Sequence, residues 1–127
     1  MIVVDTSALV AIALKEEKSD ACVQALESES ELLISAGTIA EVLVVSARRG
    51  FVEAVTGLLD GFDFEIEPVT KAFARRIGDA YAQWGKALHP AGLNFGDCFA
   101  YALAKERSCR LLFVGDDFSN TDVESVL

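Results

Sequence analysis

The sequence predicts an α/β domain built on a mainly parallel sheet. Short apolar runs alternate along the chain with longer stretches in which apolar residues recur every three or four positions. That alternation is typical of strands joined by helices. The length of 127 residues fits one domain, residues 1–127, and no repeat, low-complexity tract or Pro/Gly/Ser-rich linker divides it. Apolar residues make up 52% of the chain, which favours a packed core over disorder.

The first half of the chain is expected to hold two strands and four helices. An apolar run ends at Asp5, and the stretch from Ser7 onward is apolar almost all round, which indicates a buried helix. Gly50 and Gly61 each follow a helical pattern, at a position where glycine commonly ends a helix. We therefore expect strands at 2–4 and 32–35, and helices at 7–16, 19–28, 38–49 and 52–59.

The second half continues the same alternation. Pro68 follows a short apolar run, Thr70 can cap a long helix, and Asn94 opens a second one. We expect strands at 64–66 and 111–114, an edge strand at 123–126, and helices at 70–84 and 94–107. The segment 85–92 contains Pro90 and two glycines and is expected to be a loop.

The net charge of −9 is unusual for a protein that binds nucleic acid, because phosphate contacts normally come from Lys and Arg. Two interpretations are open. The acids can form a solvated surface that aids solubility, or some of them can converge and bind divalent cations that supply positive charge. An acidic protein also suits a basic partner.

Cysteine and histidine content excludes several chemistries. Cys22, Cys98 and Cys109 are odd in number and form no Cys-x-x-Cys pair, so neither a disulfide framework nor a thiolate zinc site is indicated. The single histidine, His89, excludes a two-histidine ribonuclease and a His-rich zinc site. No apolar segment approaches the ~20 residues that span a bilayer, and the first residues carry no basic signal region. We expect a cytoplasmic protein.

Acidic residues follow several of the predicted strands. In open parallel sheets the ligand site lies beyond the carboxyl ends of the strands. Asp5 ends the first strand, and Asp116 and Asp117 follow the last buried one. Glu41 lies in the expected first turn of the helix after the second strand. These acids are therefore expected at one edge of the sheet.

Two helix starts resemble each other in the order of residue types. Thr38-Ile-Ala-Glu41 and Asn94-Phe-Gly-Asp97 each run from a capping residue through a large apolar and a small residue to an acid. In both helices the acid lies off the apolar stripe. A purely structural role is an alternative, because each segment resembles a capping box and acids favour a first helical turn. The strand-end acids can likewise bond a turn.

Convergence favours a functional role for these acids. Carboxylates that cluster repel one another, so they must bind protons or a cation. Oxygen ligands suit Mg²⁺ or Mn²⁺, and two such ions about 4 Å apart can stabilise both the attacking and the leaving oxygen in phosphodiester cleavage. Thr6 and Ser7 can cap the helix that begins there, or their hydroxyls can bond a carboxylate or a metal-bound water.

These residues also carry a family resemblance. Asp5-Thr6-Ser7-Ala8-Leu9, placed after an N-terminal strand, resembles the opening motif of PIN domains. Glu41, Asp97 within Asn-Phe-Gly-Asp, and the segment Gly-Asp-Asp-Phe-Ser at 115–119 resemble the remaining motifs of the VapC branch, the toxins of type II toxin–antitoxin systems. The resemblance covers nearly the whole chain. It implies a PIN-like twisted, mainly parallel sheet of about five strands flanked by helices.

The resemblance implies an Mg²⁺-dependent endoribonuclease, with Mn²⁺ as the alternative metal, in which a metal-activated water cleaves RNA phosphodiesters. Carried over by position, Asp5, Glu41 and Asp97 become catalytic, metal-binding carboxylates. Asp116 is the first choice for the fourth carboxylate, and Asp117 is the alternative because the spacing here is tight. Thr6, Ser7 and Asp117 are expected to support these ligands.

The resemblance also implies partners: an RNA substrate such as transfer RNA, a cognate antitoxin, and a second copy of the chain in a homodimer, with no membrane. An antitoxin of this type places a basic side chain in the acidic pocket, a pairing that charge favours. Two other functions stay open, a PIN-like binding module without catalysis and another Mg²⁺-dependent phosphate-handling domain. A receiver domain is disfavoured because no Lys stands beside Asp116.

Overall fold

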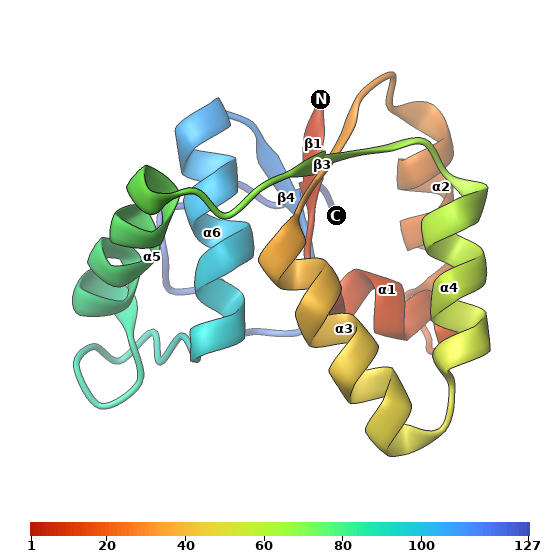
Figure 1. The fold of residues 1–127 in the computed structure, drawn as a ribbon, viewed down its shortest axis with the longest axis horizontal. Coiled ribbons are helices and arrows are strands. Elements are labelled where there is room, and N and C mark those ends of the chain that lie inside the picture. Colours follow the sequence, from red (N-terminus) through yellow and green to blue (C-terminus); the bar gives the residue numbers. More distant parts are fainter.

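The computed structural model describes residues 1–127 and has one parallel sheet between two layers of helices (Figure 1). The sheet has four strands in the order β3-β2-β1-β4. The strands are β1 (Ile2–Val4), β2 (Leu32–Ser35), β3 (Phe64–Glu67) and β4 (Arg110–Leu112). The helices are α1 (Thr6–Ala13), α2 (Ser19–Ser28), α3 (Ala36–Arg49), α4 (Val52–Gly61), α5 (Lys71–Trp84) and α6 (Phe95–Arg107). None of the helices has the length and apolar character required to span a bilayer.

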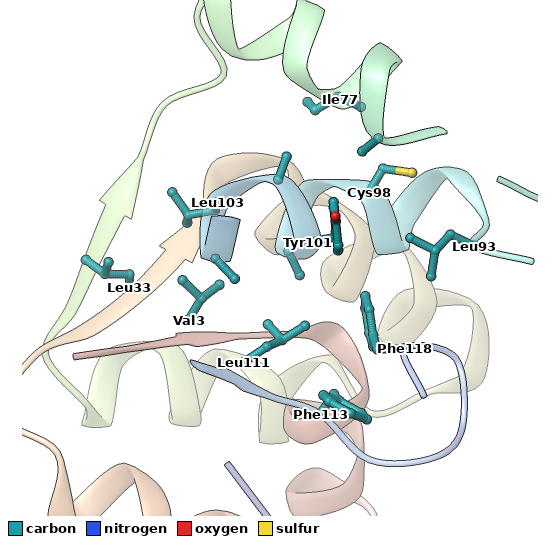
Figure 2. Close-up of a cluster of buried hydrophobic side chains, with 14 of the residues drawn as sticks. Val3, Leu33, Ile77, Leu93, Cys98, Tyr101, Leu103, Leu111, Phe113 and Phe118 are labelled. Atoms are coloured by element: carbon teal, nitrogen blue, oxygen red, sulfur yellow. The ribbon is translucent and has the colours of Figure 1, made fainter. Parts of the chain in front are cut away.

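Both faces of the sheet are buried, as in most parallel sheets. Alternate side chains of a strand point to opposite faces. Val3, Leu33 and Leu111 therefore pack against α5 and α6 on one face, together with Phe118 of the last loop (Figure 2). Their neighbours along the strands pack against α1, α2, α3 and α4 on the other face. Helix α3 contacts α1 in one layer and α6 in the other.

The predicted α/β class and the parallel sheet are confirmed. The expected edge strand at 123–126 is reduced to an isolated parallel bridge between Leu111 and Ser125. The amide of Leu111 donates to the carbonyl oxygen of Glu124 at 2.9 Å, and the amide of Val126 donates to that of Leu111 at 3.0 Å. Turns and bends occupy residues 115–122, and the chain pairs with β4 only after them.

Helix α3 begins two residues earlier than predicted. The side chain of Ser35, the last residue of β2, accepts a hydrogen bond from the amide of Gly37 at 3.1 Å and caps the helix. The alternative of a capping box at Thr38 and Glu41 is therefore wrong, because Thr38 lies inside the first turn, and Glu41 lies in the second turn rather than the expected first. The direct passages from β1 into α1 and from β2 into α3 place both helix starts at the carboxyl edge of the sheet.

Candidate active site

A pocket of about 230 Å³ lies at the carboxyl edge of the sheet. Five of its lining residues are acidic and none is Lys, Arg or His. The lining consists of Asp5, Thr6, Ser7, Val10, Glu16, Glu41, Asn94, Asp97, Val114 and Asp117. The structure thus brings together Asp5, Glu41 and Asp97 from three separate parts of the chain, as the strand-end argument expected.

Asp5 is buried at the end of β1 and caps α1. One carboxylate oxygen, Oδ2, accepts hydrogen bonds from the amide and the hydroxyl of Ser7, at 3.0 and 2.6 Å. The other oxygen, Oδ1, is buried and has no hydrogen-bond partner. Burial raises the pKa of Asp5 to about 6, against the opposing effect of the bonds from Ser7. A buried carboxylate oxygen without a donor is costly, so this atom is suited to a positive ligand.

The hydroxyls of Thr6 and Ser7 hold the pocket together. Ser7 Oγ accepts from the amide of Val114 at 3.0 Å while it donates to Asp5, which ties the start of α1 to the end of β4. Thr6 Oγ1 donates to Glu41 Oε1 at 2.5 Å and so links α1 to α3. Each hydroxyl therefore bonds a carboxylate, which is one of the two functions considered for these residues.

Asp97 serves the fold and the pocket together. It forms a capping box with Asn94, in which each side chain accepts from the other residue's amide at 3.0 Å, so the predicted box at this helix is confirmed. Asp97 is only 6% exposed although it lies off the apolar stripe, because α6 is packed between α5, α3 and the sheet. Burial raises its pKa to about 7, and the negative charges of Asp5, Asp117 and Glu41 add to the rise.

The structure places Asp117 in the pocket rather than Asp116. Both residues are exposed, but Asp117 lines the pocket and its charge acts on Asp97, whereas Asp116 is outside the lining. The ring of the next residue, Phe118, is buried against Phe113 at a centroid distance of 5.0 Å (Figure 2). This anchor fixes the orientation of the loop, which a sequence motif alone does not specify.

Sequence reasoning missed three other lining residues, Val10, Glu16 and Val114, and considered Asn94 only as a cap. Glu16 lies just beyond α1 and no local pattern distinguishes it from the other exposed acids. His89 lies outside the pocket: its Nδ1 accepts from the amide of Ala91 at 2.9 Å and its ring packs on Trp84. It lies in the loop that the sequence predicted at 85–92.

The donor set fits a hard divalent cation. Asp5 presents a buried, unpartnered oxygen, and the carboxylates around it are the ligand type that Mg²⁺ and Mn²⁺ prefer. As the side chains stand, no three of them form a direct ligand group around one position. Mg²⁺ usually keeps several waters and takes only one or two carboxylates, so water can complete such a set.

The family of the chain follows from comparison with known proteins. The family model of the PIN domain matches residues 2–124. The chain belongs to the PIN-domain family. This PIN domain is 41% identical to ribonuclease VapC28 of Mycobacterium tuberculosis over 129 aligned residues, which cover 98% of the chain and 97% of the relative. A likeness of that extent to a VapC protein confirms the branch suggested by the sequence motifs.

Solved structures share the fold of this PIN domain. The crystal structure of Mycobacterium tuberculosis VapC20, a sarcin-ricin-loop-cleaving toxin, has a TM-score of 0.80 at 16% identity and covers 99% of this chain and 98% of its own. A toxin–antitoxin complex from Klebsiella pneumoniae has a TM-score of 0.69 at 20% identity, with coverage of 96% and 93%. At these identities the likeness shows the fold alone.

Proposed function

We propose that this PIN domain is an Mg²⁺-dependent endoribonuclease, with Mn²⁺ able to replace Mg²⁺, and the toxin of a VapBC-type pair. Membership of the VapC branch makes the chain an RNA-cleaving hydrolase, because full-length relatives about 40% identical are named ribonucleases. The single observation that carries the metal dependence is Asp5 Oδ1, buried without a partner in a pocket that has five acids and no basic residue.

Asp5, Glu41 and Asp97 are the proposed ligands, and Asp117 takes the fourth place that the sequence motif gave first to Asp116. A bound divalent cation would polarise the scissile phosphate and lower the pKa of the attacking water. The chain itself supplies orientation. Ser7 fixes one oxygen of Asp5 and leaves the other without a partner, and Thr6 fixes one oxygen of Glu41. The pocket offers no histidine as a general base.

A cognate antitoxin is the proposed protein partner. The Klebsiella pneumoniae structure with this fold is a toxin–antitoxin complex. The acidic pocket also lacks any internal cation, so a Lys or Arg from a partner would find several carboxylates to pair with. Such a side chain would compete with the metal, which gives the antitoxin a direct way to inhibit cleavage.

A homodimer is proposed as well. Leu43 and Val44 on α3 are 38% and 59% exposed, and Phe95 on the neighbouring α6 is 68% exposed. Apolar side chains of this size are commonly covered by a protein partner when they gather on a surface. RNA is the proposed substrate, with transfer RNA as the first class to test. A cytoplasmic location is proposed with it, because three free cysteines are in keeping with the reducing cytosol, which contains transfer RNA.

The test is cleavage of labelled total RNA, including transfer RNA, by the purified chain with Mg²⁺, with Mn²⁺ and with EDTA. Asp5→Asn and Asp97→Asn remove proposed ligands, and Asp60→Asn on the exposed face of α4 is the matched control. We expect metal-dependent cleavage that both ligand variants lose and the control retains. Equal cleavage by the folded ligand variants would refute the assignment. RNA that is bound but never cut would favour the binding-module alternative.

A further inference from the structure

Helices α3 and α6 meet through a reciprocal pair of glycine contacts. Gly37 of α3 is covered by the ring of Phe99 from α6, and Gly96 of α6 is covered by the carboxylate of Glu41 from α3. Each helix thus contributes one glycine and, about one turn later, the side chain that covers the other glycine. A Cβ atom at either glycine would overlap the group that covers it.

The contact at Gly96 requires space rather than a special backbone conformation. Gly96 is buried within α6 and is not among the glycines with a positive φ, which are Gly50, Gly92 and Gly115. Helix propensity alone would favour alanine over glycine by up to about 1 kcal/mol. The feature that alanine cannot reproduce is the room for both oxygens of the Glu41 carboxylate against the backbone of α6.

The same carboxylate is held from its other side by Thr6, whose hydroxyl donates to Oε1 at 2.5 Å. Glu41 therefore lies between the start of α1 and the start of α6, next to the residue that precedes Asp97. Glu41, Thr6 and Asp97 all line the acidic pocket, whereas Gly96 itself does not. Any group that displaces Glu41 from α6 would consequently change the spacing of the pocket carboxylates.

We propose that Gly96 is a positioning residue for the metal site: by lacking a side chain, it lets the Glu41 carboxylate lie beside Asp97 in the pocket. This inference depends on the proposed function, since it concerns the same cation site. It assigns a role to the third residue of Asn94-Phe-Gly-Asp97, where the sequence showed only that a small residue precedes the acid.

The substitution Gly96→Ala separates this role from a role in folding. The atoms in the way belong to the end of a flexible side chain, so Glu41 can turn aside and the protein can still fold. Turning aside breaks the bond to Thr6 and withdraws one carboxylate from the site. We expect the affinity for Mn²⁺ to fall about 10- to 100-fold, the range typical when a group that orients a metal ligand is lost.

The experiment measures Mn²⁺ binding to the full chain by isothermal titration calorimetry, with the melting temperature of the metal-free protein recorded for every variant. Gly78→Ala is the matched control, because Gly78 lies within α5 and a Cβ there would meet nothing within 4 Å. We expect Gly78→Ala to bind Mn²⁺ like the wild type. Equal losses in the two glycine variants would overturn the inference, as would Mn²⁺ binding by Gly96→Ala within twofold of the wild type.

A second comparison removes the overlap from the other side. Glu41→Asp shortens the side chain and draws its carboxylate away from position 96. In the Glu41→Asp background, adding Gly96→Ala should then lower the Mn²⁺ affinity less than about threefold. Such a difference from its effect in the wild type is a coupling that only direct contact explains. An equal cost in both backgrounds would refute the contact as the cause. A wild-type chain that binds no Mn²⁺ would overturn the proposed function and the inference together, whereas the other failures leave the proposed function intact.

Discussion

The two ends of the sheet use carboxylates in opposite ways. At the carboxyl end of the strands, the acids of the pocket have no cationic partner within the chain. At the other end, Glu29 pairs with the N-terminal ammonium at 2.8 Å and with Arg110 at 3.2 Å. The chain has enough basic residues to neutralise one end and leaves the other negative.

The pKa shifts follow the same division. A hydrogen bond from the N-terminal ammonium lowers the pKa of Glu29, and one from the Tyr101 hydroxyl lowers that of Asp122. Burial raises the pKa of Asp5 to about 6 and that of Asp97 to about 7. Glu29 and Asp122 therefore stabilise the fold when charged, whereas Asp5 and Asp97 cost stability until protons or a cation neutralise them.

Size does not distinguish the functional end. A larger hollow of about 710 Å³ lies at the amino end of the strands and is lined by Met1, Lys105, Arg107 and Arg110 among others. All four of these positive groups already form ion pairs within the chain. The smaller pocket is the better candidate because its charges are unpaired, and unpaired buried charge is what a ligand can relieve.

The largest effect is expected when the two loop acids, Asp116 and Asp117, are replaced one at a time by asparagine. Asp117→Asn should lower kcat/KM for RNA about 10- to 100-fold, because Asp117 lines the pocket and its charge acts on Asp97. Asp116→Asn should change kcat/KM less than about twofold, the size expected for an exposed residue outside the site. A larger loss of kcat/KM in Asp116→Asn than in Asp117→Asn would make Asp116 the fourth carboxylate of the site instead.

Tyr101→Phe should lower the free energy of unfolding without affecting the acidic pocket. The hydroxyl accepts from Trp84 Nε1 at 2.8 Å and donates to Asp122 at 2.6 Å, so its loss leaves two polar groups without that partner. We expect a loss of about 1–3 kcal/mol in the free energy of unfolding, measured by urea denaturation. RNA cleavage below the melting range should stay unchanged, and selective loss of cleavage would show that the two ends are coupled.

In EDTA the melting temperature should fall as the pH rises from about 5 to about 8. Asp5 and Asp97 have raised pKa values of about 6 and about 7 in the folded chain, against 3.8 for an ordinary Asp. The folded state therefore binds more protons than the unfolded state across this window, and raising the pH removes that stabilisation. We expect a fall of at least about 4 °C, the change that about 1 kcal/mol produces in a domain of this size.

Two controls sharpen this prediction. Asp97→Asn should flatten the decline, because it removes the group with the larger rise in pKa. Saturating Mn²⁺ at about pH 8 should restore the melting temperature, since a ligand that binds only the folded state stabilises it. A melting temperature that is independent of pH in EDTA would contradict the view that the pocket acids cost stability.

The smallest effect is expected from Glu29→Gln at the paired end. It removes both ion pairs of Glu29, but these are solvent-accessible and screened, so the loss should not exceed about 1 kcal/mol. Thermal melting at low and high salt measures it, and the loss should shrink as salt increases. A larger, salt-independent loss would indicate that Glu29 also contributes packing.

Local patterns were sufficient for much of the fold. Apolar runs predicted the four strands, and the capping box at Asn94 predicted the start of α6, because these features depend on residues close together in sequence. The strand-end rule then brought Asp5, Glu41 and Asp97 to one edge. Ser35 and Thr38 are both residues that can cap α3. Ser35 is the cap because β2 runs directly into the helix.

By itself, then, the sequence determined the α/β class, the order of the elements and the edge at which the acids gather, since periodicity and capping are encoded over a few residues. Only the tertiary structure decided that Asp117 faces the pocket, that Asp97 is buried, and that Glu41 rests against Gly96. These outcomes depend on how Phe118 anchors its loop and how closely α3 approaches α6. Such distances arise from packing between segments remote in sequence, which no local pattern specifies.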